Sequence, residues 1–199
     1  RVVPRGFTRV LARLAELSAR GVRVVLFTGN HDMWCYDYLA QECGVEIVRN
    51  PRVVELDGVK VHLAHGDNLN ISGQPMLKLM NTIFRSSVAR TLFSWLVHPD
   101  LALKFGLWWS GKSRKSHNKT LMGVDNLRPL VEYAREHNFR NGDVEHYIFG
   151  HMHLPHYLRE ERFEILFLGD WCGAEAVYAT MNDDNNLKLN TFAIDETVS

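Results

Sequence analysis

The sequence has few cysteines and no long apolar run, and its charges balance. Three of the 199 residues are cysteine, an odd number, and no two of them form a C-x-x-C pair. This spacing indicates neither a disulfide framework nor a zinc knuckle, and it favours a reducing compartment. No apolar run reaches the roughly 18 residues of a membrane-spanning helix. Lys plus Arg equals Asp plus Glu, 23 of each, so net charge identifies no partner.

The charge is unevenly distributed along the chain. Between Met76 and Lys119 there are eight basic residues and one acidic residue, Asp100. This segment is therefore strongly positive and the rest of the chain correspondingly negative, which indicates an anionic partner for one region. The basic residues are Lys78, Arg85, Arg90, Lys104, Lys112, Arg114, Lys115 and Lys119.

The order of helical and strand patterns predicts an α/β fold. Apolar side chains recur at helical spacing over 8–19, and 22–27 is a continuous β-branched run typical of a buried strand. An Asp57-Gly58 pair between two apolar runs predicts a β-hairpin over 52–64. Further expected elements are a helix over 33–43, a strand over 45–48, helical stretches within 75–109, a helix over 127–137, a strand over 147–149, and strands around 157–168, 177–181 and 187–193. We expect one domain, residues 1–199, with a helical insertion near 70–120.

Three short motifs follow predicted strands. They are Gly29-Asn30-His31-Asp32, His65-Gly66-Asp67 and Gly150-His151-Met152-His153. Alone, G-N-H-D or H-G-D is more often a turn, and G-H-x-H is a stronger signal whose alternative is a solvent-exposed histidine pair. Ligands in α/β sheets bind at the carboxyl ends of strands, where all three motifs can meet. Their imidazoles, amide oxygen and carboxylates suit Mn²⁺, Fe or Zn²⁺. Two such ions about 3.5–4 Å apart can stabilise the attacking and leaving oxygens of a phosphate ester.

This combination resembles the calcineurin-like metallophosphoesterase family, whose later motifs are G-N-H-[DE], H-G-D and G-H-x-H. The resemblance implies a β-sandwich flanked by helices (αββα) and two divalent metal ions, with Mn²⁺ the expected metal. It implies that one ion is bound by Asn30, His65 and His151, and the other by His153. It also implies that His31 contacts the phosphate and assists the leaving group. We further expect carboxylates that orient the ligand imidazoles: Asp32, Asp67 and Asp170.

The family's two earlier motifs, D-x-H and G-D-x-x-D, do not precede Gly29 in this sequence. They lie on the family's first two strands and supply two metal ligands and the bridging carboxylate. We therefore expect that the first strands are missing from an N-terminally truncated chain. We also expect the 199 residues alone to bind metal weakly and to be inactive.

Three features narrow the resemblance to the UDP-2,3-diacylglucosamine pyrophosphatases of lipid A biosynthesis. They are the basic helical insertion, Leu168-Gly169-Asp170-Trp171, and the polar run 112–119 followed by Gly123-Val124-Asp125. The resemblance implies that the insertion is a cap that holds acyl chains. It also implies substrate contacts from Ser116, Asn118 and Lys119.

We therefore expect a hydrolase that converts UDP-2,3-diacylglucosamine to UMP and 2,3-diacylglucosamine 1-phosphate. The expected location is the cytoplasm, peripheral on the inner membrane through the cap, since methionines and aromatic residues adjoin basic ones there. No nucleic-acid partner is expected. The alternatives are another metal-dependent phosphoesterase acting on a soluble nucleotide or phosphodiester, and a non-catalytic scaffold. A scaffold has no use for so many polar ligands without a metal.

Overall fold

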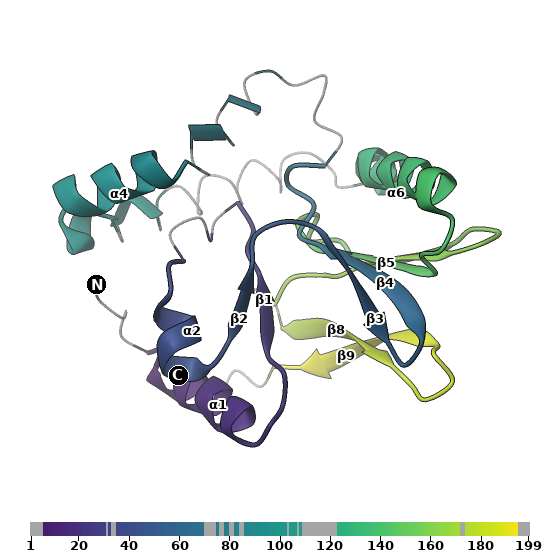
Figure 1. Cartoon of the computed structure of the whole chain (residues 1–199), viewed down its shortest axis with the longest axis horizontal. Coiled ribbons are helices and arrows are strands. Elements are labelled where there is room, and N and C mark those ends of the chain that lie inside the picture. The colour runs from purple at the N-terminus through teal and green to yellow at the C-terminus, as the bar shows by residue number, and fades with distance from the viewer. Residues whose placement is uncertain are drawn as a thin grey trace. The chain divides into compact units, whose positions relative to one another are not determined.

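The computed structural model describes residues 6–30, 32, 35–69, 75, 78–79, 82–83, 86–102, 104–106, 108, 123–171 and 174–194. The chain forms two compact units (Figure 1). Unit 1 comprises Arg1–Asn50 and Ile71–Leu121, and unit 2 comprises Pro51–Asn70 and Met122–Ser199. The expectation of one domain with an insertion near 70–120 stays a prediction.

Unit 1 contains a small parallel sheet and helices. Strand β1 (Val25–Phe27) pairs in parallel with β2 (Glu46–Val48). The described helices are α1 (Thr8–Ala19), α2 (Tyr38–Cys43) and α4 (Ser87–Leu96). The bounds of α1 match the prediction. No helix among the described residues is long and apolar enough to cross a membrane.

Two predicted boundaries in unit 1 were wrong. Strand β1 begins at Val25 rather than Val22, because the Val22 amide donates to the Leu17 carbonyl (3.0 Å) and still closes the end of α1. Helix α2 begins at Tyr38 rather than near residue 33. The Cys35 amide donates to the Asp32 carbonyl (2.9 Å), and residues 35–37 lie outside the helix.

Unit 2 is built on a five-stranded mixed sheet in the order β3-β4-β5-β7-β6. Its three central strands are parallel, and the two outer strands are antiparallel to their neighbours. The predicted hairpin is confirmed, because Asp57 (φ 49°) and Gly58 (φ 85°) both have the positive φ of a tight turn. The strands are β3 (Arg52–Leu56), β4 (Val59–Ala64), β5 (His146–Phe149), β6 (His156–Arg159) and β7 (Glu164–Phe167).

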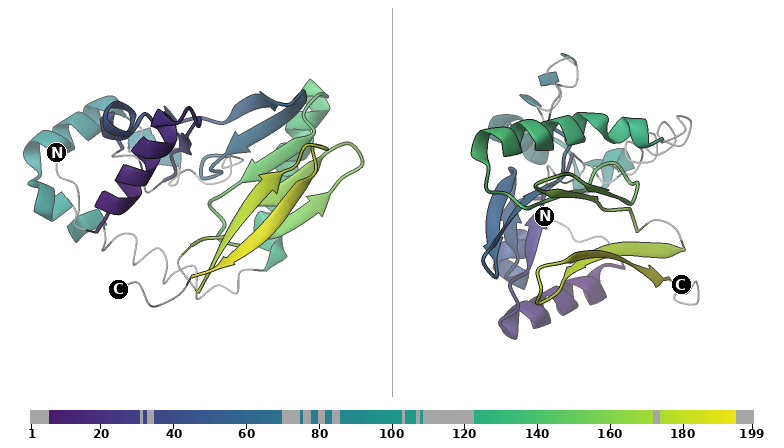
Figure 2. Two further views of the ribbon diagram at one scale, coloured as in Figure 1. Left: turned by 90° about the horizontal axis from the view of Figure 1, so that it is seen from below. Right: turned by 90° about the vertical axis from the view of Figure 1, so that its right-hand side faces the viewer.

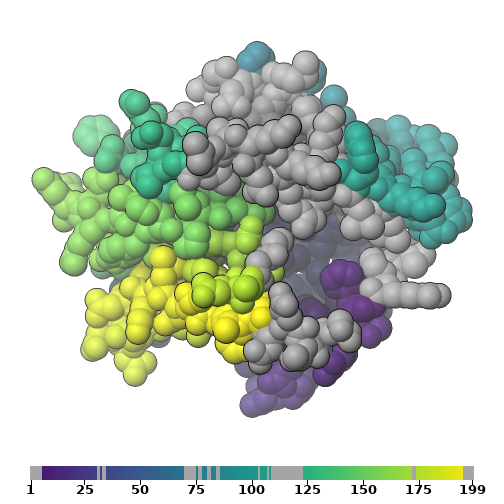
Figure 3. Space-filling view, turned by 180° about the vertical axis from the view of Figure 1, so that it is seen from behind, coloured from purple at the N-terminus to yellow at the C-terminus, as the bar shows by residue number. Residues whose placement is uncertain are grey.

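Both faces of this sheet are covered within unit 2 (Figure 2). Helix α6 (Arg128–Asn141), preceded by the 3₁₀ turn η1 (Val124–Leu127), lies on one face. The antiparallel hairpin of β8 (Glu175–Met181) and β9 (Leu187–Ala193) lies on the other. The outer side of this hairpin forms part of the molecular surface (Figure 3). The mixed α/β architecture confirms the predicted fold class.

The core of unit 2 lies between the sheet and α6. Tyr147, Phe149 and Phe167 are fully buried, and Ala134 of α6 is buried against them. Strand β7 buries three consecutive side chains, as expected for a strand covered on both faces. This packing holds the ends of the central strands in place.

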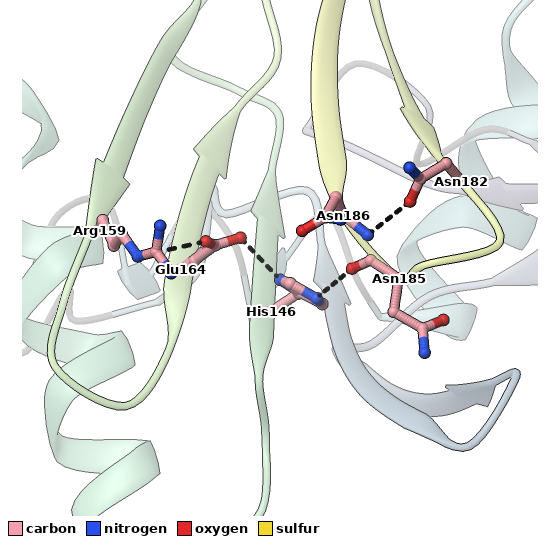
Figure 4. Close-up of polar contacts among 6 residues, drawn as sticks. All are labelled: His146, Arg159, Glu164, Asn182, Asn185 and Asn186. Carbon is pink, nitrogen blue, oxygen red and sulfur yellow. Dashed lines mark hydrogen bonds and ion pairs between the residues drawn. The ribbon is translucent and has the colours of Figure 1, made fainter.

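A polar cluster joins the sheet to the β8–β9 turn (Figure 4). His146 Nε2 lies 3.1 Å from the Asn185 carbonyl oxygen and donates to it, because a carbonyl only accepts. His146 Nδ1 lies 3.3 Å from Glu164 Oε2, and Glu164 also contacts Arg159. The Asn186 amide closes the turn by donating to Asn182 Oδ1. One buried imidazole therefore links β5, β7 and the hairpin.

A second buried imidazole, His62 of β4, is surrounded by aromatic rings. It stacks on Tyr147 (ring centroids 5.2 Å apart), and its Nε2 lies 3.2 Å from the Tyr133 hydroxyl. Burial, and to a lesser extent the neighbouring His137, lowers the pKa of His62 from 6.5 to about 4. His62 is therefore neutral in the folded protein at pH 7.

The low pKa of His62 predicts acid sensitivity. Between pH 6.5 and 4 the unfolded chain binds a proton that the folded chain does not, so stability present above pH 6.5 is lost as the pH falls toward 4. A shift of this size corresponds to about 3 kcal/mol. Urea unfolding of metal-free protein should show a smaller loss for His62→Phe between pH 7 and 4 than for wild type. Equal losses in both proteins would contradict the role of His62.

Candidate metal centre

Three parallel strands of unit 2 end at the same edge of the sheet. Ala64 of β4 is paired with Phe149 of β5, and Phe149 with Phe167 of β7. The H-G-D motif follows β4 directly, G-H-x-H follows β5, and Asp170 lies shortly after β7. The register therefore brings these polar segments to one carboxyl edge, where α/β proteins bind ligands.

Two of the predicted metal ligands are neighbours at this edge. The rings of His65 and His151 pack edge to face, with centroids 5.1 Å apart. The glycine of H-G-D suits its backbone, because Gly66 has φ 111° and a Cβ there would lie 3.1 Å from Leu130 Cδ1. A Cβ on Gly150 would make only an ordinary contact, 3.5 Å from His65 Nδ1.

The G-H-x-H segment has an unusual backbone. His151 (φ 63°) and His153 (φ 54°) are both in the left-handed region, which costs free energy for residues other than glycine. Met152, between them, packs against the core, and its amide donates to the Gly150 carbonyl (2.7 Å). Such strain clusters at functional sites, where the surrounding structure enforces it.

His153 is oriented by a carboxylate. Its Nδ1 lies 2.8 Å from Asp170 Oδ2, and an ionised carboxylate only accepts, so Nδ1 donates. The Nε2 atom is then left as an electron-pair donor, which is the usual arrangement of a metal-binding histidine. Trp171, which follows Asp170 in the sequence, is fixed by its indole N–H, which donates to the Val177 carbonyl of β8 (2.8 Å).

The G-N-H-D motif follows β1 in unit 1. The Gly29 amide donates to Asp32 Oδ2 (3.0 Å), and the Asp32 amide donates to the Gly29 carbonyl (3.1 Å). This closed turn carries Asn30.

The carboxylate of the H-G-D motif, Asp67 in unit 2, is buried, with 5% of its surface exposed. Its side chain therefore faces other protein groups rather than solvent. The predicted phosphate-contacting and substrate-contacting residues lie outside the described residues: His31, Ser116, Asn118 and Lys119.

The residues present suit divalent metal ions in their chemistry. Within the part of the chain that the structure describes, no three His, Cys, Asp or Glu side chains lie close enough to hold an ion as they stand. The donors nevertheless fit such an ion, because two imidazoles are adjacent and a third is oriented by a carboxylate.

The chain belongs to the calcineurin-like phosphoesterase family. The family model matches residues 2–155, which include all three motifs. This match confirms the predicted resemblance. The family uses divalent metal ions, and membership indicates a hydrolase.

Comparison with individual protein sequences agrees. The chain is 40% identical over 184 residues to the UDP-2,3-diacylglucosamine hydrolase of Porphyromonas gingivalis, covering 85% of this chain and 70% of that protein. It is 24% identical to the enzyme of the same name from Haemophilus ducreyi, covering 82% and 68% of the two chains. A Thermotoga maritima protein solved by solution NMR aligns with a TM-score of 0.42 at 12% identity, over 96% of this chain and 88% of that one.

Proposed function

We propose that this protein hydrolyses the pyrophosphate of UDP-2,3-diacylglucosamine to UMP and 2,3-diacylglucosamine 1-phosphate. The observation that carries the proposal is the convergence of His65, His151 and the His153–Asp170 pair at one edge of the sheet. The 40% identity to an enzyme named for this substrate supports the choice of substrate.

The residues take the following roles in the proposal. Asn30, His65 and His151 hold one divalent ion, and His153 holds the other. Asp170 keeps His153 in the tautomer whose Nε2 is the electron-pair donor. In the proposal, Asp32 and Asp67 also orient the imidazoles that bind the metal ions.

Metal chemistry and substrate contact complete the proposed site. We expect Mn²⁺, with Fe and Zn²⁺ as the alternatives. When bound, such ions act as Lewis acids on a phosphate ester and make water nucleophilic near neutral pH. His31 contacts the phosphate and assists the leaving group, and the sugar and phosphates are contacted by Ser116, Asn118 and Lys119.

UMP release tests this function against the alternatives. The full-length protein is given UDP-2,3-diacylglucosamine or bis(p-nitrophenyl) phosphate, with Mn²⁺ or with EDTA. Mn²⁺-dependent UMP release is the expected result. Hydrolysis of the small diester alone would retain the metal site and discard the lipid substrate. Activity on neither compound would favour the non-catalytic scaffold.

We propose further that α4 brings the protein to the cytoplasmic surface of the inner membrane. An apolar ridge follows one side of this helix at helical spacing, and α4 is visible at the surface in Figure 3. Its most exposed members are Trp95 (86%) and Leu96 (80%), continued by Val88 and Leu92. The excess of basic residues over 76–119 suits anionic headgroups.

Vesicle binding tests this surface. Wild-type protein should sediment with vesicles of phosphatidylglycerol and only weakly with vesicles of phosphatidylcholine. The double variant Trp95→Ser/Leu96→Ser should lose at least about 10-fold in affinity, because two largely exposed apolar side chains no longer enter the headgroup region. Phe139→Ser changes an equally exposed residue on α6 and should bind as wild type does. Unchanged binding by the double variant would exclude α4 as the contact.

A further inference from the structure

The segment that follows the G-N-H-D turn is attached to helix α4. The Tyr36 hydroxyl donates to the Arg90 carbonyl oxygen over 2.8 Å, although the two residues are 54 positions apart. The Arg90 guanidinium carbon also lies 5.9 Å from the centre of the Tyr36 ring. Both residues belong to unit 1. One tyrosine thus makes a hydrogen bond and a cation–π contact to the same helical residue.

The turn on one side of this contact is held by its own hydrogen bonds. The Gly29 amide donates to Asp32 Oδ2, and the Cys35 amide donates to the Asp32 carbonyl. The Arg49 guanidinium donates to the Cys35 carbonyl. Tyr36 therefore extends from a backbone that is already fixed, and the turn does not depend on Tyr36 for its shape.

Helix α4, on the other side, has little burial to hold it. None of its ten residues is buried, and its apolar ridge is exposed. Its first turn is closed by the Ser86 hydroxyl, which accepts from the Ala89 amide (3.4 Å). A helix with so few buried apolar contacts has low local stability, so the loss of one directed contact should have a measurable effect on it. The hydrogen bond from the Tyr36 hydroxyl to Arg90, the fourth of the ten residues of α4, is such a contact.

We infer that Tyr36 is a positioning residue that fixes α4 relative to the turn carrying Asn30 and Asp32. The inference rests on the proposed function, because it assigns a purpose to the contact. The insertion near 70–120, which contains α4, is expected to hold the acyl chains, so the pyrophosphate of a bound substrate must lie at a set distance from the G-N-H-D turn. Tyr36 sets that distance. Hydrolysis of a small diester that does not contact α4 should not depend on this distance.

The variant Tyr36→Phe tests the inference, because it removes one hydroxyl and keeps the ring. The KM for UDP-2,3-diacylglucosamine should rise about 3- to 10-fold, the equivalent of one hydrogen bond, with kcat within about twofold. Turnover of bis(p-nitrophenyl) phosphate should not change. Amide hydrogen exchange in α4 should become faster, and exchange in α6 should stay the same. Tyr38→Phe, the matched change on the partly exposed first residue of α2, should match wild type in every measurement.

The outcomes separate the inference from the proposed function. If Tyr36→Phe leaves amide hydrogen exchange in α4 unchanged, the positioning role is overturned. An unchanged KM in a Tyr36→Phe enzyme that still releases UMP would overturn it as well. Equal losses on both substrates would assign Tyr36 to the turn itself and would also overturn it. If wild-type protein hydrolyses only the small diester, the proposed function fails. Faster α4 exchange in Tyr36→Phe would then still support the attachment of α4 by Tyr36.

Discussion

Replacing His151 by alanine is expected to reduce Mn²⁺-dependent UMP release by at least about 100-fold. Loss of a group that only orients a metal ligand typically costs 10- to 100-fold in metal affinity or activity, so loss of a ligand itself should cost more. His151 has a left-handed backbone, and its imidazole packs against that of His65 at the proposed site. His65→Ala should have an effect of the same size. The measurement is kcat/KM for the full-length protein.

A control is required because any histidine substitution can perturb folding. His156→Ala changes a histidine of β6, in the same sheet but outside the motifs, and should retain activity within about threefold. The circular dichroism spectra and melting temperatures of all three variants should stay close to those of wild type. Near-normal turnover by His65→Ala or His151→Ala would contradict the metal assignment.

Replacing Phe149 by alanine is expected to destabilise unit 2 by about 3–5 kcal/mol, the usual cost of removing a buried aromatic side chain. Phe149 has no exposed surface and packs against Phe167, with ring centroids 5.7 Å apart. It also contacts Tyr133 of α6, so the cavity would open between helix and sheet. The midpoint of urea unfolding, with the slope of the transition, measures the loss.

Phe139→Ala provides the matched comparison. Phe139 lies on α6 and is 91% exposed, so its removal should change the unfolding free energy by less than about 0.5 kcal/mol. Similar losses for the two phenylalanines would contradict the position of the core. A large loss for Phe149→Ala alone would agree with a core lying between the sheet and α6.

Much of the fold was predictable because its signals are local. The Asp57-Gly58 turn, the bounds of α1 and the strands that precede His65 and Gly150 depend on neighbouring residues. The failures arose where a short-range backbone hydrogen bond ended or delayed an element that the residue pattern alone would extend. The apolar run that begins at Val22 resembles a longer strand, but its first amide bonds back to α1.

The site could be predicted only in part. The motifs identified the side chains, and strand order explains why His65 lies next to His151. The positive φ of His151 and His153 was not predictable, because nothing in their residue type favours it strongly. The contact between Tyr36 and Arg90 was not predictable either, since a single hydrogen bond across 54 residues leaves no periodic signal.

Hydrolysis in ¹⁸O-labelled water is the most direct test of the central claim. The full-length protein is incubated with UDP-2,3-diacylglucosamine and Mn²⁺, and both products are examined by mass spectrometry. We expect water to attack the phosphorus next to uridine, which becomes UMP, so one ¹⁸O atom should appear in UMP and none in the 2,3-diacylglucosamine 1-phosphate. The account also predicts no reaction with EDTA. Label in the sugar phosphate, or UMP formed equally well without metal, would contradict it.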